Sequence, residues 1–565
     1  MRILILCHAF NSLTQRLYAE LAALGHEPSV ELDINDQVTT EAVGLFRPHL
    51  ILAPYLRRAI PEPIWRRHLC LIIHPGILGD RGPSALDWAV QEGEPDWGVT
   101  LLQAEAEMDA GPIWASRGFP MRPAKKSSLY RNEVTEAALA TVREALELLP
   151  DYMAGHWQPL PLTAANARGR WRPLMRQSDR SIDWGQEDSA RILRKLNAAD
   201  GFPGVRGELL GHPCHLYNAR PFPAASEPGK LIGRWGDGVV RATADGALWI
   251  GHVKRMDAGP RIKLPARLAI PELDGLPQLQ HPDCGDPEIR YEEAKGVGYL
   301  HFDFYNGAMG TDACRRLLAA FESAARRPTR VLVLMGGPDF FSNGLDLNRI
   351  EAAESPADAS LANIEAMDDL CRAVIACESH LTIAALQGNA GAGGAFLALA
   401  ADRVWARSGV ILNPHYKNMG NLYGSEYWTY LLPRRVGAEQ ASAIMGNRLP
   451  LTAPEAQRLG FIDDCFGDSP AGFLREVRRR AEELAASPGL AQRLADKGAR
   501  RAADEATKPL AGYRAEELSE MRRNFYGFDP SYHVARHHFV HKTPHSWTPR
   551  HLARHRELGW QVPGA

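Results

Sequence analysis

Residues Gln387–Phe396 read QGNAGAGGAF and follow the apolar run Leu381–Leu386. An apolar run of this length is typical of a buried strand, and the apolar residues after the glycines indicate a helix. Glycines between a strand and a helix let backbone N–H groups approach an anion, and the helix dipole adds favourable charge. The stretch therefore predicts an α/β domain with an anion-binding turn.

A second glycine-bearing turn reads FFSNGLDL over Phe340–Leu347 and follows the apolar strand expected at Val331–Met335. Two such turns can direct two N–H donors at one carbonyl oxygen. A dinucleotide site is the alternative, but Phe396 stands where G-x-G-x-x-G requires its third glycine. No acidic residue ends a following strand about 20 positions later, so we expect no NAD site.

This pair of turns resembles the crotonase (enoyl-CoA hydratase/isomerase) superfamily over about residues 285–510. The resemblance implies a spiral ββα domain, bound coenzyme A, and an oxyanion hole formed by the N–H groups of Leu345 and Gly393. The other turn residues that the resemblance places at the coenzyme A site are Ser342, Asn343, Gly344 and Gly394.

The chain departs from this superfamily at the two glutamates that manage water in hydratases. Phe396 and His415 occupy their places, so we do not expect ordinary enoyl-CoA hydration. Tyr416 and Glu426 fall in the region that lines the family's active site, and they are the candidate acid/base pair. The alternative is that Tyr416 packs in the core and Glu426 supplies charge at a helix N-terminus.

The first half of the chain predicts another α/β domain. Strands expected at 2–6, 49–54, 69–73 and 97–102 alternate with helical patterns, which favours a parallel sheet. His74 and Asp109 would then lie at strand ends on one edge, where such sheets bind ligands. A histidine with a carboxylate can move protons near neutral pH, although a strand-capping His and a turn Asp are the alternative.

The order of short motifs in this half is similar to that of the folate-dependent formyltransferases, over about residues 1–270. The motifs are Pro61-Glu62-Pro63, His74-Pro75-Gly76, Arg81-Gly82-Pro83-Ser84-Ala85, Asp109-Ala110-Gly111-Pro112-Ile113 and Ser181-Ile182-Asp183-Trp184. The resemblance implies a Rossmann-like catalytic domain followed by a small OB-like β-barrel domain. It also implies that His74 stabilises and protonates the tetrahedral intermediate, while Asp109 orients His74 and assists proton transfer.

The family's third catalytic residue, an Asn, is replaced here by Ile72. Losing one oxyanion donor typically costs about 10²–10³ in rate, so another donor replaces it or the acceptor needs less help. A thiol acceptor fits the second case, because a thiolate is already nucleophilic.

Four residues of this half are candidate contacts for folate or coenzyme A. Gln15 lies in the first strand-to-helix loop, and Arg81 and Gly82 belong to the third motif. Arg131 follows the basic pair Lys125-Lys126, which could hold phosphates or the folate glutamate. Such charge runs are usually solvated faces.

The bulk composition limits the partners. The 565 residues exceed one hydrophobic core, and the net charge of -2 gives no general attraction for nucleic acid or anionic membranes. No apolar run reaches the roughly 18 residues of a membrane span. The eight cysteines, Cys284 among them, form no C-x2-C pair, which predicts reduced thiols in a cytoplasmic protein.

Together these patterns predict an α/β multidomain chain with five segments. They are a formyltransferase-like catalytic domain at 1–165, a formyltransferase C-terminal-like β domain at 166–270, a linker at 271–287, a crotonase-like coenzyme A domain at 288–510, and a helical, His- and aromatic-rich C-terminal segment at 511–565.

The fusion as a whole resembles a family of nickel–iron hydrogenase maturation factors. The resemblance implies 10-formyltetrahydrofolate and coenzyme A as cofactors, formyl transfer to the thiol, and decarbonylation of formyl-CoA to supply the CO ligand of the hydrogenase. It implies small-molecule substrates, and hydrogenase maturation proteins or the hydrogenase large subunit as protein partners.

Three alternatives to this interpretation stay open. One is a formyl- or acyl-CoA hydrolase in which Glu426 activates water, and another is a non-catalytic factor that delivers a ligand. The third is tRNA formylation, which the near-neutral charge disfavours.

The C-terminal segment is rich in histidine. His537/His541 and His551/His555 have the spacing of helical metal-binding pairs. Pro544 and Pro549 interrupt the run and no acidic or cysteine ligand accompanies it, so we expect a lid or docking segment without metal.

Overall fold

The computed structural model describes every residue except 165, 284 and 563–565, and Cys284 therefore lies outside the described residues. The chain forms two compact units. One contains Met1–His281 with Pro544–Ala565, and the other contains Pro282–Thr543. Among the described helices, none combines the length and hydropathy that a membrane span needs. The seven described cysteines are all free thiols.

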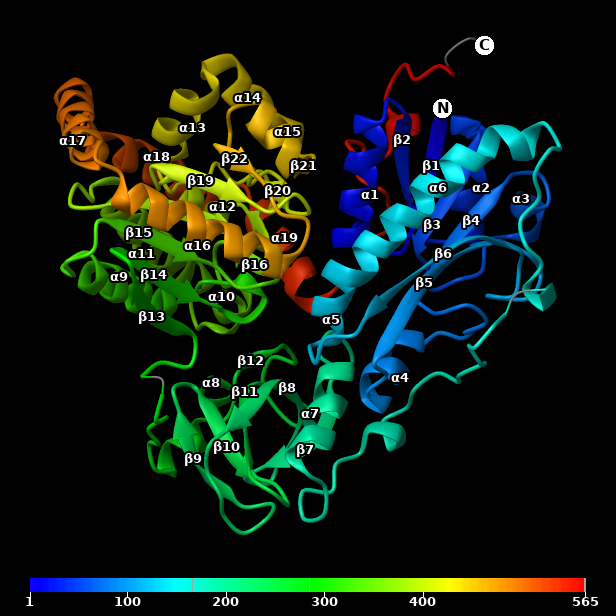
Figure 1. Cartoon of the computed structure of the whole chain (residues 1–565), viewed down its shortest axis with the longest axis horizontal. Coiled ribbons are helices and arrows are strands. Elements are labelled where there is room, and N and C mark those ends of the chain that lie inside the picture. Colours follow the sequence, from blue (N-terminus) through cyan, green and yellow to red (C-terminus); the bar gives the residue numbers. More distant parts are fainter. Residues whose placement is uncertain (165, 284, 563–565) are drawn as a thin grey trace. The chain divides into compact units, whose positions relative to one another are not determined.

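The first unit begins with strands that alternate with helices (Figure 1). The elements are β1 (Arg2–Cys7), α1 (Ser12–Ala23), β2 (Glu27–Leu32), α2 (Asp36–Phe46), β3 (Leu50–Tyr55), α3 (Glu62–Trp65), β4 (Cys70–His74), α4 (Ala85–Glu92), β5 (Asp96–Gln103), β6 (Ile113–Pro120), α5 (Lys126–Leu129), η1 (Tyr130–Val134) and α6 (Thr135–Met153). They form a sheet with the strand order β2-β1-β3-β4-β5-β6. The strands β1 to β4 are parallel to one another, and helices connect them. β5 runs antiparallel to both of its neighbours, β4 and β6.

A second, antiparallel sheet follows in the same unit. Its elements are η2 (Leu162–Ala164), η3 (Ser178–Arg180), α7 (Ser189–Ala198), β7 (Val205–Leu209), β8 (His212–Phe222), β9 (Leu231–Trp235), β10 (Gly238–Ala242), β11 (Ala247–Arg255), β12 (Leu264–Pro265), α8 (Ala266–Ala269) and η4 (Pro271–Gly275). The strand order is β7-β8-β11-β10-β9, and β12 pairs with β11. Leu248 and Ile250 alternate along β11 and pack in one core with Ile192 and Leu196 of α7.

The last described residues return to the first sheet. Leu552 accepts a hydrogen bond from the backbone of Val30 in β2, and η6 (Arg554–Arg556) follows. Glu31 is buried here and accepts from His555 Nε2 at 2.8 Å and Arg556 Nε at 2.7 Å. Because β2 is an edge strand, this segment covers backbone groups that would otherwise be open to other chains.

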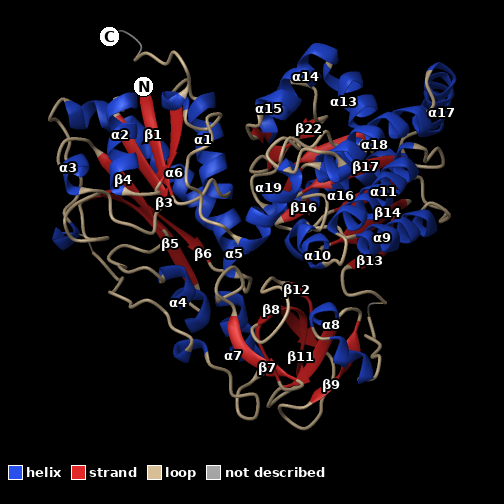
Figure 2. Cartoon of the chain, turned by 180° about the vertical axis from the view of Figure 1, so that it is seen from behind, coloured by secondary structure: helices blue, strands red, loops and turns tan. Residues whose placement is uncertain are grey.

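The second unit has two sheets and a shell of helices (Figure 2). The elements up to the second sheet's end are β13 (Ile289–Ala294), β14 (Val297–Phe302), η5 (Tyr305–Gly307), α9 (Thr311–Ala324), β15 (Val331–Met335), β16 (Phe340–Ser342), α10 (Leu347–Ala352), α11 (Pro356–Ile375), β17 (Leu381–Leu386), β18 (Asn389–Gly391), α12 (Gly393–Leu399), β19 (Arg403–Ala406), β20 (Ile411–Asn413), α13 (Trp428–Val436), α14 (Ala438–Asn447), β21 (Leu451–Thr452) and α15 (Ala453–Arg458). The rest are β22 (Asp464–Cys465), α16 (Pro470–Ala486), α17 (Leu490–Thr507), α18 (Leu510–Tyr526) and α19 (Ser531–His541).

From β15 to β20, consecutive strands alternate between the two sheets of this unit. The orders are β13-β14-β15-β17-β19-β22 and β16-β18-β20-β21, so β15, β17 and β19 each send the next strand to the other sheet. The apolar runs of β15 and β17 are neighbours and buried along their whole length, as their sequences predict. This repeat is the expected ββα spiral, and the predicted fold class is confirmed for both units.

The Glu31 cluster gives a stability prediction. Replacing Glu31 with Ala leaves the buried His555 ring and part of Arg556 without their acceptor, so the free energy of unfolding of the first unit should fall by about 3 kcal/mol. Denaturant titration followed by circular dichroism measures this. Glu41→Ala is the matched control, because exposed Glu41 pairs with the same Arg556 at 2.7 Å and should change little. Equal effects of the two variants would refute the assignment.

Candidate active sites

His74 ends β4, and its imidazole lies between two carboxylates. Nε2 is 3.2 Å from Asp80 Oδ1, and Nδ1 is 3.6 Å from Asp109 Oδ1. A Cβ on Gly76 would lie 2.4 Å from Nε2, so only glycine leaves room for this arrangement. The ring is buried, and the two carboxylates hold it in one orientation.

Asp109 reaches His74 by a different path from the one expected. β5 runs antiparallel to β4, with His74 opposite Thr100 and Leu71 opposite Gln103. The expectation that both residues end strands on one edge of a parallel sheet is therefore wrong, because antiparallel strands end at opposite edges. The loop after β5 folds back instead, and Asp109 adopts a left-handed φ of 57° within it.

Asp109 is fixed by the third motif. Its Oδ2 accepts a hydrogen bond from the Gly82 amide at 3.1 Å. Gly82 has a φ of 112°, and a Cβ there would lie 2.0 Å from the Arg172 carbonyl oxygen. The motif glycine thus allows the loop to hold the aspartate against His74.

Two further residues support His74 and were missed by sequence reasoning. Asp80 is fully buried, and its Oδ2 lies 2.6 Å from Arg172 Nη1, which in turn places Nη2 2.9 Å from Glu92. Charge-assisted bonds of this kind fix a carboxylate in place. Asp80 directly precedes the Arg81-Gly82 motif, which was the available signal. Arg172 is 92 residues away from Asp80 and had none.

The expected ligand contacts of the first unit lie near this sheet edge. Gln15 is in the first turn of α1, after β1, and donates to the Phe10 carbonyl at 3.0 Å. Since β1 and β4 point the same way, Gln15 and His74 share the carboxyl edge of the sheet, with β3 between their strands. Arg81 Nη1 pairs with Glu107 at 2.6 Å.

The basic run is engaged with protein groups. Arg131 lies in η1 and donates to Ser127 Oγ at 3.2 Å. Lys126 Nζ lies 3.0 Å from Asp87 Oδ2. Each of the two cations therefore already has at least one contact within the first unit, whatever else it binds.

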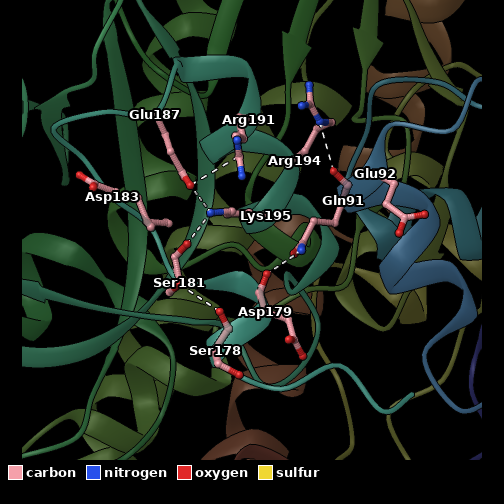
Figure 3. Close-up of a pocket in the computed structure, with 11 residues that line it drawn as sticks. Gln91, Glu92, Ser178, Asp179, Ser181, Asp183, Glu187, Arg191, Arg194 and Lys195 are labelled. Atoms are coloured by element: carbon pink, nitrogen blue, oxygen red, sulfur yellow. Dashed lines mark hydrogen bonds and ion pairs between the residues drawn. The ribbon is translucent and has the colours of Figure 1, made fainter. Parts of the chain in front are cut away.

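A polar cavity of about 540 Å³ opens between α4 and α7 (Figure 3). Two of its cations are paired with an anion of the cavity, since Lys195 Nζ lies 2.5 Å and Arg191 Nε 3.5 Å from Glu187 Oε1, and Arg194 Nε donates to the Gln91 carbonyl at 3.3 Å. His74 and Asp109 are not among the residues that line it. We therefore assign it no part in the chemistry.

The two glycine turns of the second unit lie side by side. They follow β16 and β18, which pair in parallel. A Cβ on Gly344 would lie 3.2 Å from the Gly393 nitrogen, and one on Gly394 would lie 2.1 Å from the Ser342 carbonyl oxygen. In the described parts of the chain, neither the Leu345 nor the Gly393 amide is hydrogen-bonded to the protein. These two amides are available to a ligand oxygen.

Side chains of the first turn hold its shape. Ser342 Oγ accepts from the Gly344 amide at 3.0 Å and donates to Met309 Sδ at 3.1 Å. Asn343 Nδ2 donates to the Asn306 carbonyl at 2.8 Å. These bonds keep the turn pre-organised, which electrostatic catalysis requires.

Tyr416 and Glu426 form a buried pair beside the second turn. Tyr416 Oη donates to Glu426 Oε2 at 2.5 Å. A Cβ on Gly393 would lie 2.1 Å from Glu426 Oε1, so the carboxyl sits directly against the glycine that carries the amide donor. Glu426 has no exposed surface, and Oε1 bonds no group among the described residues. Glu426 directly precedes Tyr427, the N-cap of α13, and its carboxyl is buried at this helix start.

Two more buried carboxylates support this pair. Asp368 of α11 accepts from the Glu426 amide at 2.8 Å and from Ser425 Oγ at 2.9 Å. Glu517 of α18 accepts from the Tyr427 amide at 2.9 Å. Burial raises the pKa of Asp368 and of Glu517 to about 7. Burial and the Asp368 charge raise the pKa of Glu426 to about 8. Sequence reasoning missed both supports, because no local motif marks them.

The positions of the two hydratase glutamates carry other groups. Phe396 is fully buried and stacks on Tyr416, with ring centroids 5.5 Å apart and an interplanar angle of 14°. His415 is also buried. An aromatic ring therefore packs against the tyrosine of the Tyr416–Glu426 pair.

These modules match known families. Residues 24–146 match the formyl transferase family, residues 174–260 the formyl transferase C-terminal domain, and residues 292–548 the enoyl-CoA hydratase/isomerase family. A methionyl-tRNA formyltransferase of Roseiflexus castenholzii is 36% identical over 199 residues, 34% of this chain and 60% of that protein. The fold and sites define a formyltransferase module joined to an enoyl-CoA hydratase-like module.

Two relatives cover the whole chain. The hydrogenase maturation factor HoxX of Bradyrhizobium diazoefficiens is 54% identical over 98% of this chain and 97% of its own length. The crystal structure of HypX from Aquifex aeolicus in complex with tetrahydrofolic acid has a TM-score of 0.95 and 46% identity and covers 100% of both chains. The chain belongs to the HypX/HoxX family of hydrogenase maturation factors.

The raised pKa of Glu426 predicts a pH-dependent stability. The folded protein keeps this carboxyl protonated up to about pH 8, whereas the unfolded chain ionises it above its ordinary pKa of 4.5. The unfolded chain then binds fewer protons in that window, so stability should fall as pH rises through it. Glu426→Gln should remove a few kcal/mol of this fall, at about 1.4 kcal/mol per unit of pKa.

Denaturant titrations of the second unit's transition at about pH 5 and pH 8 measure the change. Asp368 and Glu517 still contribute in the variant, so the fall should become smaller and not vanish. Glu439→Gln is the control, because Glu439 is exposed. An unchanged pH dependence in Glu426→Gln would show that this carboxyl ionises normally.

Proposed function

We propose that the chain makes carbon monoxide from 10-formyltetrahydrofolate in two steps, through formyl-CoA, and supplies it as the CO ligand of a nickel–iron hydrogenase. The observation that carries the proposal is the buried Glu426–Tyr416 pair against the Gly393 amide, where burial raises the pKa of the carboxyl to about 8. A carboxyl with this pKa can take a proton from a thioester held by the two glycine turns and give it back near neutral pH. Membership in the hydrogenase maturation factor family supports the use of the product.

The first step is formyl transfer to the thiol of coenzyme A. The thiolate forms a bond to the formyl carbon, and the bond from that carbon to the folate nitrogen breaks. His74 supplies the proton that the departing nitrogen takes, and Asp109 and Asp80 stabilise the charged imidazole. The tetrahydrofolate in the related Aquifex aeolicus structure and the formyl transferase match support folate as the donor.

The second step is decarbonylation. The amides of Leu345 and Gly393 hold the thioester oxygen. Ionised Glu426 takes the formyl proton, the C–H electron pair stays on carbon, and the C–S pair leaves with sulfur. Tyr416 keeps the carboxyl in position, and the proton returns from Glu426 to the thiolate. The products are CO and coenzyme A, and no oxidant or reductant is consumed.

The remaining contacts are assigned by position. Ser342, Asn343, Gly344 and Gly394 belong to the turns that would receive coenzyme A, and Gln15, Arg81, Gly82 and Arg131 are the proposed contacts of the first unit for folate or coenzyme A. Crotonase-type folds support coenzyme A as the carrier, and the reduced cysteines fit a cytoplasmic enzyme. Hydrogenase maturation proteins or the hydrogenase large subunit are the proposed protein partners.

The product distinguishes this function from hydrolysis. Purified protein with 10-formyltetrahydrofolate and catalytic coenzyme A should release CO and tetrahydrofolate in equal amounts. A haemoglobin binding assay quantifies CO, and formate is measured enzymatically in the same sample. Formate without CO would instead identify a hydrolase in which Glu426 activates water. If neither CO nor formate forms, the chain would be a non-catalytic delivery factor.

Variants should separate the two steps. His74→Ala should lower CO formation from 10-formyltetrahydrofolate by about 10²–10⁴, because it removes the proton donor, and should leave CO formation from added formyl-CoA unchanged. Glu426→Gln should suppress CO from both substrates while formyl-CoA accumulates from the folate. Rates are followed by CO release and by chromatography of the thioester.

Matched controls test specificity. His156→Ala changes an exposed histidine of the first unit, and Glu439→Gln an exposed glutamate of the second. If His74→Ala also lost CO formation from formyl-CoA, this would contradict the assignment of formyl transfer to the first unit and decarbonylation to the second.

A further inference from the structure

The histidines of α19 meet a carboxylate that lies far away in the sequence. His537 and His541 are one helical turn apart, with ring centroids at 4.2 Å. Glu351 of α10 directs Oε1 at both, 2.8 Å from His537 Nδ1 and 3.1 Å from His541 Nε2. The expectation that no acidic ligand accompanies these histidines is therefore wrong, because α10 packs against α19 in the fold.

The other predicted pair does not form. His555 lies in the short η6 turn, where it is buried and bonded to Glu31 and to Ser29 Oγ at 2.7 Å. The two prolines do not interrupt the first pair. Pro544 and Pro549 come after α19 has ended at His541 and leave the first pair on one continuous helix.

Arg536 orients the carboxylate of Glu351. Arg536 Nε lies 2.7 Å from Oε2, so Oε1 alone faces the imidazoles. Arg536 is itself buried and also contacts His533 Nδ1 at 2.8 Å. Partners of this kind fix metal ligands in other proteins, and they are retained because they orient the ligand and tune its basicity.

We propose that Glu351, His537 and His541 bind a divalent first-row transition-metal ion, with Zn²⁺ as the reference case. The three donor atoms lie within 4.8 Å of one another. Ligands of a tetrahedral zinc site lie about 3.4 Å apart, given bonds of about 2.0–2.1 Å, so the side chains need to move by only a few tenths of an ångström to about 1 Å. Two imidazoles and one carboxylate are a donor set that zinc sites use.

The site has room for further ligands. The Glu351 side chain is 10% exposed, while His541 is 31% and His537 56% exposed. The ion would therefore be held on its inner side by the protein and remain open to water or another ligand on its outer side. The proposal is independent of formyl transfer, since it uses no residue of either candidate active site.

Metal binding to the full chain without an affinity tag tests the proposal. The protein is treated with a chelator, dialysed, and titrated with Zn²⁺ in a calorimeter and with Co²⁺ in a spectrophotometer. One saturable equivalent is expected, with Co²⁺ absorption bands of a site with nitrogen and oxygen ligands. His537→Ala, His541→Ala and Glu351→Gln should each weaken binding at least about tenfold, the lower end of what loss of an outer-shell partner costs.

His538→Ala is the matched control, because His538 is an exposed histidine of the same helix and lies outside the cluster. Its affinity should equal that of the unchanged chain. Absence of saturable binding would overturn the proposal, as would equal losses in His538→Ala and in the ligand variants. Unchanged affinity in the His537 and His541 variants would place any bound ion elsewhere and also overturn it.

Discussion

Burial of the Glu426 carboxyl is the constraint on which the proposed chemistry of the second unit depends. In water this group would have a pKa near 4.5, and its carboxylate would be a weak base towards a proton on carbon. The protein raises its pKa by removing water and by placing Asp368 nearby, and it keeps the group in place with two unusual backbone angles. Glu426 and Tyr427 both have left-handed φ, 58° and 60°, which costs non-glycine residues about 1–2 kcal/mol each. Asp368 and Glu517 accept hydrogen bonds from the two amides, so the carboxylates that tune the acid also hold its strained turn.

The candidate site of the first unit is built around a histidine. In the proposed formyl transfer His74 passes a proton to the departing nitrogen, and its imidazole lies between Asp80 and Asp109 while Arg172 pairs with Asp80. In the proposed function, the first unit thus suits a transient cation, and the second suits a carboxyl that takes a proton and returns it. The two demands are hard to meet in a single pocket, because a charge that stabilises imidazolium would repel a carboxylate. Separate modules avoid this conflict.

Sequence patterns predicted the architecture well where local signals determine it. Strand–helix alternation and the glycine turns identified both folds, because turn chemistry and apolar periodicity are local properties. The candidates His74 and Asp109 came from their spacing together with the formyltransferase resemblance, and Tyr416 and Glu426 came from the crotonase resemblance. The local signals did not show that β5 is antiparallel, since strand direction depends on a long-range pairing. Nor did they show Asp80 with Arg172, Asp368 with Glu517, or Glu351 beside α19. Each of these contacts joins segments that only the folded chain brings together.

The return of the last residues to β2 has a consequence for biosynthesis. The second unit is, in sequence, an insertion within the first, because Pro282–Thr543 separates the first sheet from the segment that covers its edge. A ribosome therefore completes the entire second unit before it releases the residues that shield β2. During that interval the edge of the nascent first sheet is open to association with other chains, and Glu31 lacks its contacts with His555 and Arg556. A chain that stops before Pro544 would leave the same edge uncovered.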